Sequence, residues 1–263
     1  MPSLPLWNMD QFALFTLVLA RVGGLTLTAP AFSVRDVPLQ VRGLLALAIA
    51  LVVLPTQWSV SVAGPSSPAL WVVLLGAEAI TGAFLGLGIV LLFSGMQMAG
   101  ELVGRLGGLM LADVLDPSSG EPTPLLGRLM WLVALVVFLL IGGHRMAVGA
   151  LLDTFRSLPP GTMASVESMT RVLGELLSQS FALGVRVSAP VVVAVLLATL
   201  VLGLINRSIP QLNLLAVGFG LNSMLAFGLL AIVLGAGAMI FQSQVEPTFD
   251  RLVDALHPST LGP

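Results

Sequence analysis

The fold class is decided by residues 69–99, which read ALWVVLLGAEAITGAFLGLGIVLLFSGMQMA and hold a single charge, Glu78. An α-helix rises 1.5 Å per residue, so about 20 apolar residues cross the roughly 30 Å hydrocarbon core of a bilayer. The run is longer than one upright span needs. We therefore expect a long third membrane helix that tilts, bends or leaves the bilayer, and we expect it to be kinked.

Further apolar runs precede and follow this one, and they cover residues 12–32, 43–54, 125–142, 181–205 and 212–241. Pro55 follows the second run and either kinks that helix or ends it early. The short connection over residues 206–211 predicts an antiparallel hairpin of the last two runs. The sequence thus predicts an all-α integral membrane protein of about six hydrophobic helices.

Two less apolar segments complete the chain. Residues 163–180 place Val166, Met169 and Leu173 on one helical face, which predicts a separate interfacial or hairpin helix. Residues 246–263 are polar and predict a frayed or exposed tail. We expect a single membrane domain over residues 1–263, in which residues 1–160 hold the N-terminal helices and residues 161–245 the C-terminal helical hairpin.

Composition agrees with a lipid environment and excludes several kinds of protein. Of 263 residues, 57% are hydrophobic and 9% are charged, against roughly 25% charged in soluble domains. The net charge is −2 with no lysine, so no basic surface for nucleic acid is expected. Cysteine is absent and the two histidines lie far apart, so we expect no metal site. Because no catalytic motif occurs, we expect no enzyme, no catalytic residue and no cofactor.

Ionisable side chains inside the apolar runs need an explanation, because an unpaired charge in hydrocarbon costs several kcal/mol. Arg21, Glu78 and Arg186 are such residues. A structural ion pair, for instance Arg21 with Glu78, is favoured over a proton or ion relay, and pairing with a neighbouring subunit is a third reading. Glu101 and Arg105 are four residues apart and predict a salt bridge on a helix surface.

The segment over residues 107–120 combines glycines with soft apolar side chains such as Met110 and Leu111. Glycine gives a flexible backbone and methionine adapts its packing, so the segment suits a closure that moves. A kinked helix packed in the core is the alternative. The carboxylates of Asp113, Asp116 and Glu121 indicate either a cation site or, as we favour, a turn set by Asp116 and Pro117.

Several short motifs, in order along the chain, resemble the FliR family of bacterial type III export proteins. They are Arg21-Val22, Thr28-Ala-Pro-Ala-Phe-Ser with Val37-Pro38, Gly100-Glu101, Gly107-Gly108-Leu109, Asp116-Pro117, Gly143-His144, Leu151, Asp153-Thr-Phe155, Leu158-Pro159, Asn206-Arg207, Pro210-Gln211-Leu212-Asn213 and Gly218-Phe219. The Gly143-His144 and Asp153-Thr-Phe155 motifs favour the flagellar branch over the related injectisome proteins.

The resemblance implies a non-enzymatic subunit of the flagellar export gate in the bacterial inner membrane, at the flagellar basal body. Its helices would form tilted hairpins around a channel for unfolded flagellar proteins, together with FliP-like, FliQ-like and FlhB-like subunits and membrane lipid. The segment after the third helix would plug that channel through Gly107, Gly108, Leu109, Met110, Leu111, Asp113, Asp116 and Pro117. The residues that would make intramembrane or inter-subunit polar contacts are Arg21, Glu78, Glu101, Arg105, Arg186, Asn206, Arg207, Gln211 and Asn213.

Other functions stay open at the level of sequence. An injectisome export subunit shares much of the hairpin motif. A small secondary transporter would bind its substrate with the intramembrane charges at broken helices, although no convincing internal repeat is visible. A membrane enzyme ranks third, because the sequence holds no spacing that brings two polar groups into one pocket.

Overall fold

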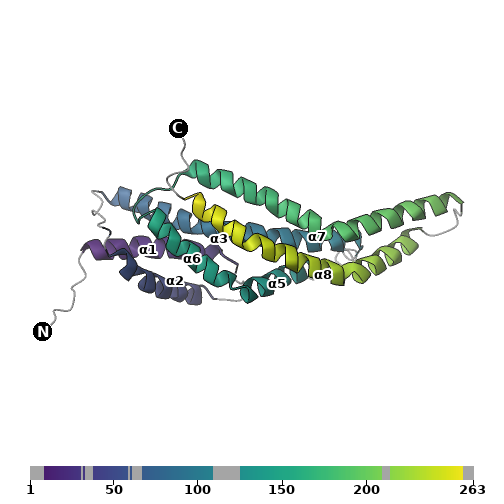
Figure 1. Ribbon diagram of the computed structural model, residues 1–263, viewed down its shortest axis with the longest axis horizontal. Helices are drawn as coiled ribbons and strands as arrows, with labels where there is room; N and C mark the ends of the chain where they lie inside the picture. The colour runs from purple at the N-terminus through teal and green to yellow at the C-terminus, as the bar shows by residue number, and fades with distance from the viewer. Residues whose placement is uncertain are drawn as a thin grey trace. The chain divides into compact units, whose positions relative to one another are not determined.

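In a computed structural model, the described part of the chain consists of α-helices, one short 3₁₀ helix and their connections (Figure 1). The described residues are 9–30, 32, 38–58, 60, 67–108, 125–208 and 214–256. The elements are α1 (Met9–Thr28), α2 (Leu39–Val53), η1 (Leu54–Gln57), α3 (Pro68–Leu106), α5 (Leu125–Leu140), α6 (Gly143–Ser157), α7 (Val166–Ser208) and α8 (Leu214–Asp254).

Helices α1, α3, α7 and α8, and α2 taken with η1, are long and apolar enough to cross a membrane. The pair α5 and α6 counts as a sixth candidate span if the two helices are taken together. The prediction of an all-α membrane protein with about six hydrophobic helices is therefore confirmed for the described residues. Helix α3 is continuous over 39 residues, and the kink predicted in it stays a prediction.

Two helix boundaries coincide with a proline or a glycine in the sequence. Helix α2 ends at Val53, and Pro55 sits in the first turn of the 3₁₀ helix that follows, as the proline predicts. Helices α5 and α6 are separated at Gly142, whose φ of 78° lies in the left-handed region that glycine adopts without strain. The fourth apolar run, residues 125–142, therefore ends as α5, and α6 follows it as a separate helix.

Two expectations about the C-terminal part are wrong. Residues 163–180 do not form a separate helix, because α7 continues through them from Val166 to Ser208. The tail is not frayed over its first half, because α8 continues to Asp254. Val245, Phe249 and Leu252 are buried there at helical spacing, so this end of α8 is held by packing.

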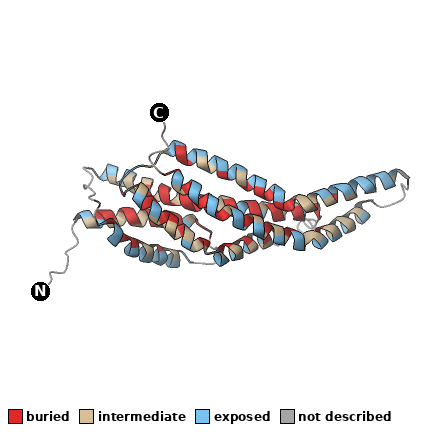
Figure 2. Ribbon diagram, in the orientation of Figure 1, coloured by how far each residue is buried: buried red, intermediate tan, exposed pale blue. Residues whose placement is uncertain are grey.

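Contacts group the chain into two compact units, of which the first comprises Met1–Leu91, Gly142–Leu176 and Val245–Pro263. In this unit, α1 is buried along much of its length (Figure 2). Leu14 and Leu17 pack with Leu54, and Trp71 and Leu74 cover them. The result is a core that joins α1 to η1 and to the start of α3.

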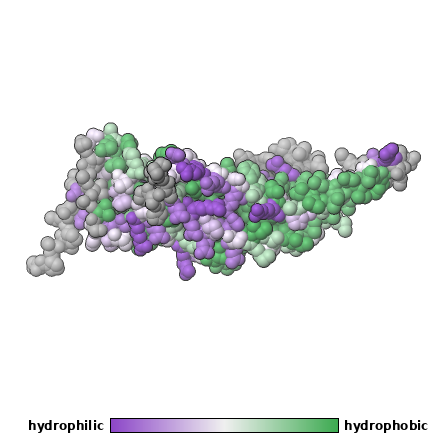
Figure 3. Space-filling view, turned by 45° about the horizontal axis from the view of Figure 1, so that its top comes forward, coloured by the Kyte–Doolittle hydropathy of each residue, from purple (hydrophilic) through white to green (hydrophobic). Residues whose placement is uncertain are grey.

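The second unit comprises Leu92–Ile141 and Leu177–Gln244. Its core holds the ring of Phe93, which stacks edge to face on Phe138 and Phe241 at centroid distances of 5.4 and 5.3 Å. Gln179 donates a hydrogen bond to Gln244, which ties α7 to α8. The C-terminal part of α7 and the N-terminal part of α8 expose hydrophobic residues on their surface (Figure 3).

Candidate functional site

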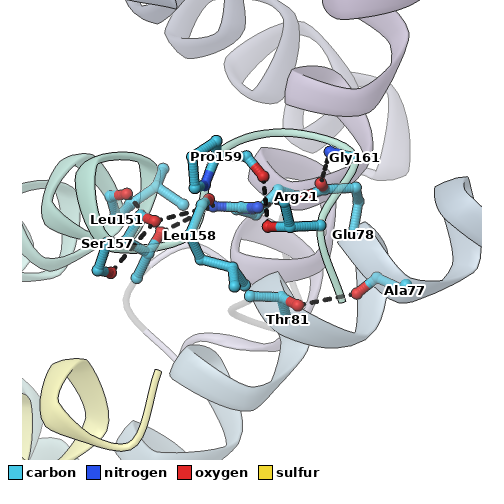
Figure 4. A network of polar contacts seen from close by, with 11 residues as sticks. Arg21, Ala77, Glu78, Thr81, Leu151, Ser157, Leu158, Pro159 and Gly161 are labelled. Carbon is cyan, nitrogen blue, oxygen red and sulfur yellow. Dashed lines mark hydrogen bonds and ion pairs between the residues drawn. The ribbon is translucent and has the colours of Figure 1, made fainter. Parts of the chain in front are cut away.

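A buried ion pair forms the centre of the polar network in the first unit (Figure 4). Arg21 of α1 donates from Nε to Oε2 of Glu78 on α3 over 2.5 Å, and the two side chains are 0% and 1% exposed. Charges removed from water need both a partner and further hydrogen bonds. The ion pair expected from the sequence is therefore present within this chain.

The segment that follows α6 supplies those further hydrogen bonds. Arg21 Nη1 donates to the carbonyl oxygens of Leu158 at 2.9 Å and Thr154 at 3.2 Å. Glu78 Oε1 accepts a hydrogen bond from the backbone N–H of Gly161 at 2.8 Å. The ring of Phe155 lies 4.4 Å from the guanidinium carbon, a cation–π contact. One network thus joins α1, α3 and the turn after α6.

Glycines bring α1 and α3 close enough for this contact. A methyl group placed on Gly82 would overlap the backbone oxygen of Arg21, and one on Gly86 would overlap Thr28. On α1, a methyl group on Gly24 would overlap the backbone oxygen of Ala79. The small-residue spacing of Gly82 and Gly86 therefore serves close helix packing beside the ion pair.

The arrangement at Arg21 and Glu78 fits a structural clamp better than a relay. Among the described residues, the polar groups around the pair are backbone amides, carbonyls and the Thr154 hydroxyl, and Arg21 Nη2 has no hydrogen-bond partner there. No second carboxylate or histidine of the described chain bonds to the pair. The clamp sets the positions of three segments relative to one another.

A second polar site lies in the other unit, at the C-terminal end of α3. Glu101 accepts a hydrogen bond from Gln97 at 3.0 Å and forms the predicted salt bridge with Arg105 at 3.7 Å. Beside it is an open cavity of about 260 Å³ between α3 and α7, lined by Ser94, Gln97, Met98, Glu101, Leu177, Ser180 and Phe181. Its lining mixes polar and apolar side chains.

The end of α3 is fixed to α8 immediately before the segment expected to plug a channel. Ser223 donates from Oγ to the carbonyl oxygen of Gly107 at 2.8 Å. Gly108 has a φ of 73°, and a methyl group on it would lie 2.8 Å from the ring of Phe219. Gly108 is thus required by the backbone and packing at this turn, and Gly107 contributes a carbonyl acceptor. The plug candidates outside the described residues are Leu109, Met110, Leu111, Asp113, Asp116 and Pro117.

The remaining polar candidates fall on α7 and beyond it. Arg186 lies exposed in the middle of α7, and Arg207 lies exposed near its end, where Asn206 is half-buried. Gln211 and Asn213 are outside the described residues. The structure therefore brings together Arg21 with Glu78 and Glu101 with Arg105, and Arg186 belongs to neither ion pair.

Several contributing residues had no functional role in the sequence analysis. Thr154, Phe155 and Leu158 around Arg21 were quoted only as parts of motifs, and Ser223 was not singled out. Nothing in the sequence indicated these contacts. Each residue contributes a backbone carbonyl, a ring face or a hydroxyl, and only the fold brings that group close to its partner. Among the described residues, no group of three histidine or acidic side chains could hold a metal ion.

Comparison with known proteins relates this chain to one family of bacterial export proteins. Residues 12–248 match the family described as bacterial export proteins, family 1. The chain is 32% identical over 238 residues to the flagellar biosynthetic protein FliR of Escherichia coli (strain K12), with 90% of each chain covered. It is 26% identical over 253 residues to FliR of Bacillus subtilis (strain 168), with 94% of this chain and 96% of that protein covered. The match extends over nearly the whole described structure.

Proposed function

Since this chain belongs to the bacterial export proteins of family 1, we propose that it is a non-enzymatic subunit of the flagellar type III protein export gate. The observation that carries the proposal is the similarity to the E. coli flagellar biosynthetic protein, at 32% identity over 90% of both chains. The long apolar helices support it, because a gate subunit must be held in a membrane or among other apolar helices.

The proposed location is the bacterial inner membrane, within the flagellar basal body. In the apolar windows of α2 with η1, of α7 and of α8, only 22% of the residues are buried in the isolated chain. Exposed apolar surface of this extent is stable only against lipid or against another protein. The proposed protein partners are the FliP-like, FliQ-like and FlhB-like subunits of the gate, and unfolded flagellar proteins are the proposed cargo.

Within the gate, residues 107–120 are proposed to help close the channel. Support comes from the turn at their start, where Gly107 is held by Ser223 and Gly108 lies against Phe219. A closure that opens repeatedly needs a fixed base and a deformable body. The contacts to α8 provide the fixed base, and the glycine-rich and methionine-containing sequence provides the deformable body.

The clamp at Arg21 and Glu78 has a supporting role in this proposal. It holds α1, α3 and the turn after α6 together inside one subunit, so that the subunit presents a defined surface to its partners. Its two opposite charges pair with each other inside the subunit, and no transport step is assigned to them.

Deleting the gene in the native host and measuring export of flagellar proteins into the medium tests the proposed function. We expect loss of export and of filaments, with both restored by the wild-type gene on a plasmid. Normal export in the deletion strain would contradict the flagellar assignment. Where the host also carries an injectisome, loss of injectisome secretion with intact flagellar export would assign the chain to that system.

A further inference from the structure

The open cavity between α3 and α7 in the second unit has no role in the function proposed above. Its α3 wall includes Gln97, Met98 and Glu101, and its α7 wall includes Ser180 and Phe181. One wall thus supplies a carboxylate and an amide, and the other supplies a hydroxyl and an aromatic ring. The volume of about 260 Å³ is near the lower end of the range for small-ligand cavities in proteins.

The cavity lies where α7 changes from a charged helix to an apolar one. Glu167, Arg171 and Glu175 are exposed on the part of α7 that precedes the cavity. Residues 187–205, which follow it, hold no ionisable side chain and are about as long as one membrane span. Charged side chains stay in water, whereas such an apolar stretch is stable in hydrocarbon. The cavity wall at Phe181 therefore lies between these two environments, at the level of lipid headgroups.

Glu101 and Arg105 place two opposite charges side by side at this cavity. Their side chains are 25% and 61% exposed, and the distance of 3.7 Å between Glu101 Oε2 and Arg105 Nη2 is longer than a hydrogen bond. Gln97 donates from Nε2 to Glu101 Oε1, and its own Oε1 is a further acceptor. A carboxylate accepts about four hydrogen bonds in all. The pair can therefore bind a second, zwitterionic pair of charges in the opposite order.

An apolar strip leads away from the cavity along α7. Phe181, Val185 and Leu196 are 55%, 58% and 58% exposed. With 3.6 residues per turn, the three side chains lie within about 60° of one another around the helix axis. An aliphatic chain that begins in the cavity can follow this strip toward the apolar part of the helix.

We propose that the cavity binds the headgroup of an ethanolamine phospholipid. The ammonium bonds to Glu101 and Gln97, and the phosphate bonds to Arg105. One acyl chain follows Phe181 and Val185. A primary ammonium has three N–H donors for the carboxylate and amide oxygens, whereas a choline group has none and a glycerol headgroup has no positive charge. The inference rests on the membrane location in the proposed function, to which it adds one bound lipid.

The test uses the assembled complex, purified in mild detergent from the native host with this chain tagged at its own locus. Native mass spectrometry of the delipidated complex follows titrations with phosphatidylethanolamine, phosphatidylcholine and phosphatidylglycerol of identical acyl chains. We expect one phosphatidylethanolamine site whose affinity falls about tenfold in Glu101→Gln, because a hydrogen bond to a charged group is lost. Binding of the other two lipids should not change.

The matched control is Glu167→Gln. Glu167 pairs with Arg171 at the same four-residue spacing, with side chains 79% and 57% exposed, and it is not part of the cavity lining. This variant should bind phosphatidylethanolamine as the wild type does. Wild-type affinity in Glu101→Gln would overturn the inference. Failure to recover a wild-type complex with other gate subunits would instead overturn the proposed function, so the two failures differ.

A photoactivatable phosphatidylethanolamine keeps the proposal testable if Glu101→Gln does not assemble. Irradiation of the wild-type complex should label peptides that contain Met98 or Phe181. Unlabelled phosphatidylethanolamine should suppress this label, whereas phosphatidylcholine and soluble phosphoethanolamine at the same concentration should not. Equal suppression by either competitor, or labelling confined to other parts of the complex, would overturn the inference. A neighbouring protein that fills the cavity would give this last result.

Discussion

Arg21 and Glu78 are 57 residues apart in the sequence, yet their side chains meet at 2.5 Å with at most 1% of either exposed. Each also bonds to backbone groups of the turn after α6, through Leu158 and Gly161. One ion pair therefore fixes three segments that the chain connects only through long intervening stretches.

Removing one partner of this pair should destabilise the protein strongly. Arg21→Met or Glu78→Leu leaves a buried charge without its counter-charge, which costs about 3–5 kcal/mol. The double variant removes both charges and should be less destabilised than the sum of the single variants. Thermal unfolding of the purified protein in detergent measures this. If the stability loss of the double variant equalled the sum of the losses of the single variants, the proposed coupling of Arg21 and Glu78 would be contradicted.

An exposed ion pair on α6 should behave differently. Arg156 and Asp153 lie 3.0 Å apart, with side chains 82% and 52% exposed. Solvent screens such a pair, so Arg156→Gln should change the stability by less than about 0.5 kcal/mol. The same unfolding assay serves as the measurement. A loss as large as that of Arg21→Met would show that the assay does not separate buried from exposed pairs.

The close approach of α1 to α3 should depend on Gly82. Gly82→Ala forces a methyl group onto the backbone oxygen of Arg21, and such overpacking costs about 1–3 kcal/mol. Gly76→Ala is the matched control on the same helix, because no atom lies within 4 Å of the added group. It should be neutral or slightly stabilising, since alanine favours helix. Equal effects of both variants on the unfolding temperature would refute this packing.

The turn before the plug segment should depend on Gly108. A side chain at its φ of 73° is strained by about 1–2 kcal/mol and meets the ring of Phe219. Gly108→Ala should therefore loosen the base of residues 109–120 and raise the ion leak of membranes that contain the assembled gate. Leak is followed with a pH-sensitive dye in loaded vesicles. Gly104→Ala, which makes only ordinary contacts, should keep the wild-type leak rate.

The ion pair could be predicted because it rests on a simple pattern. Two opposite charges in apolar helices must be paired. The donors and acceptors around Arg21 could not be predicted, because Thr154 and Gly161 contribute groups that depend on the path of the turn after α6. A sequence without structure does not give that path.

Both errors at the C-terminal end have a physical reason. Gln179 interrupts the apolar pattern of α7, but it bonds to Gln244 on α8, so the helix continues through it. Pro247 and the charges near it indicate a helix end, yet α8 continues because Phe249 and Leu252 are buried. In both places tertiary contacts outweigh the local signal. The helical spacing of Val245, Phe249 and Leu252 in the sequence already indicated that α8 continues through this region.

The central claim is that this chain works inside a complex of membrane subunits, and one experiment tests it most directly. The tagged chain is extracted gently from its native host, and the proteins that elute with it on size exclusion are identified by mass spectrometry. We predict a large particle that contains FliP-like and FliQ-like proteins. Recovery of the chain alone, as a stable small species, would contradict the account.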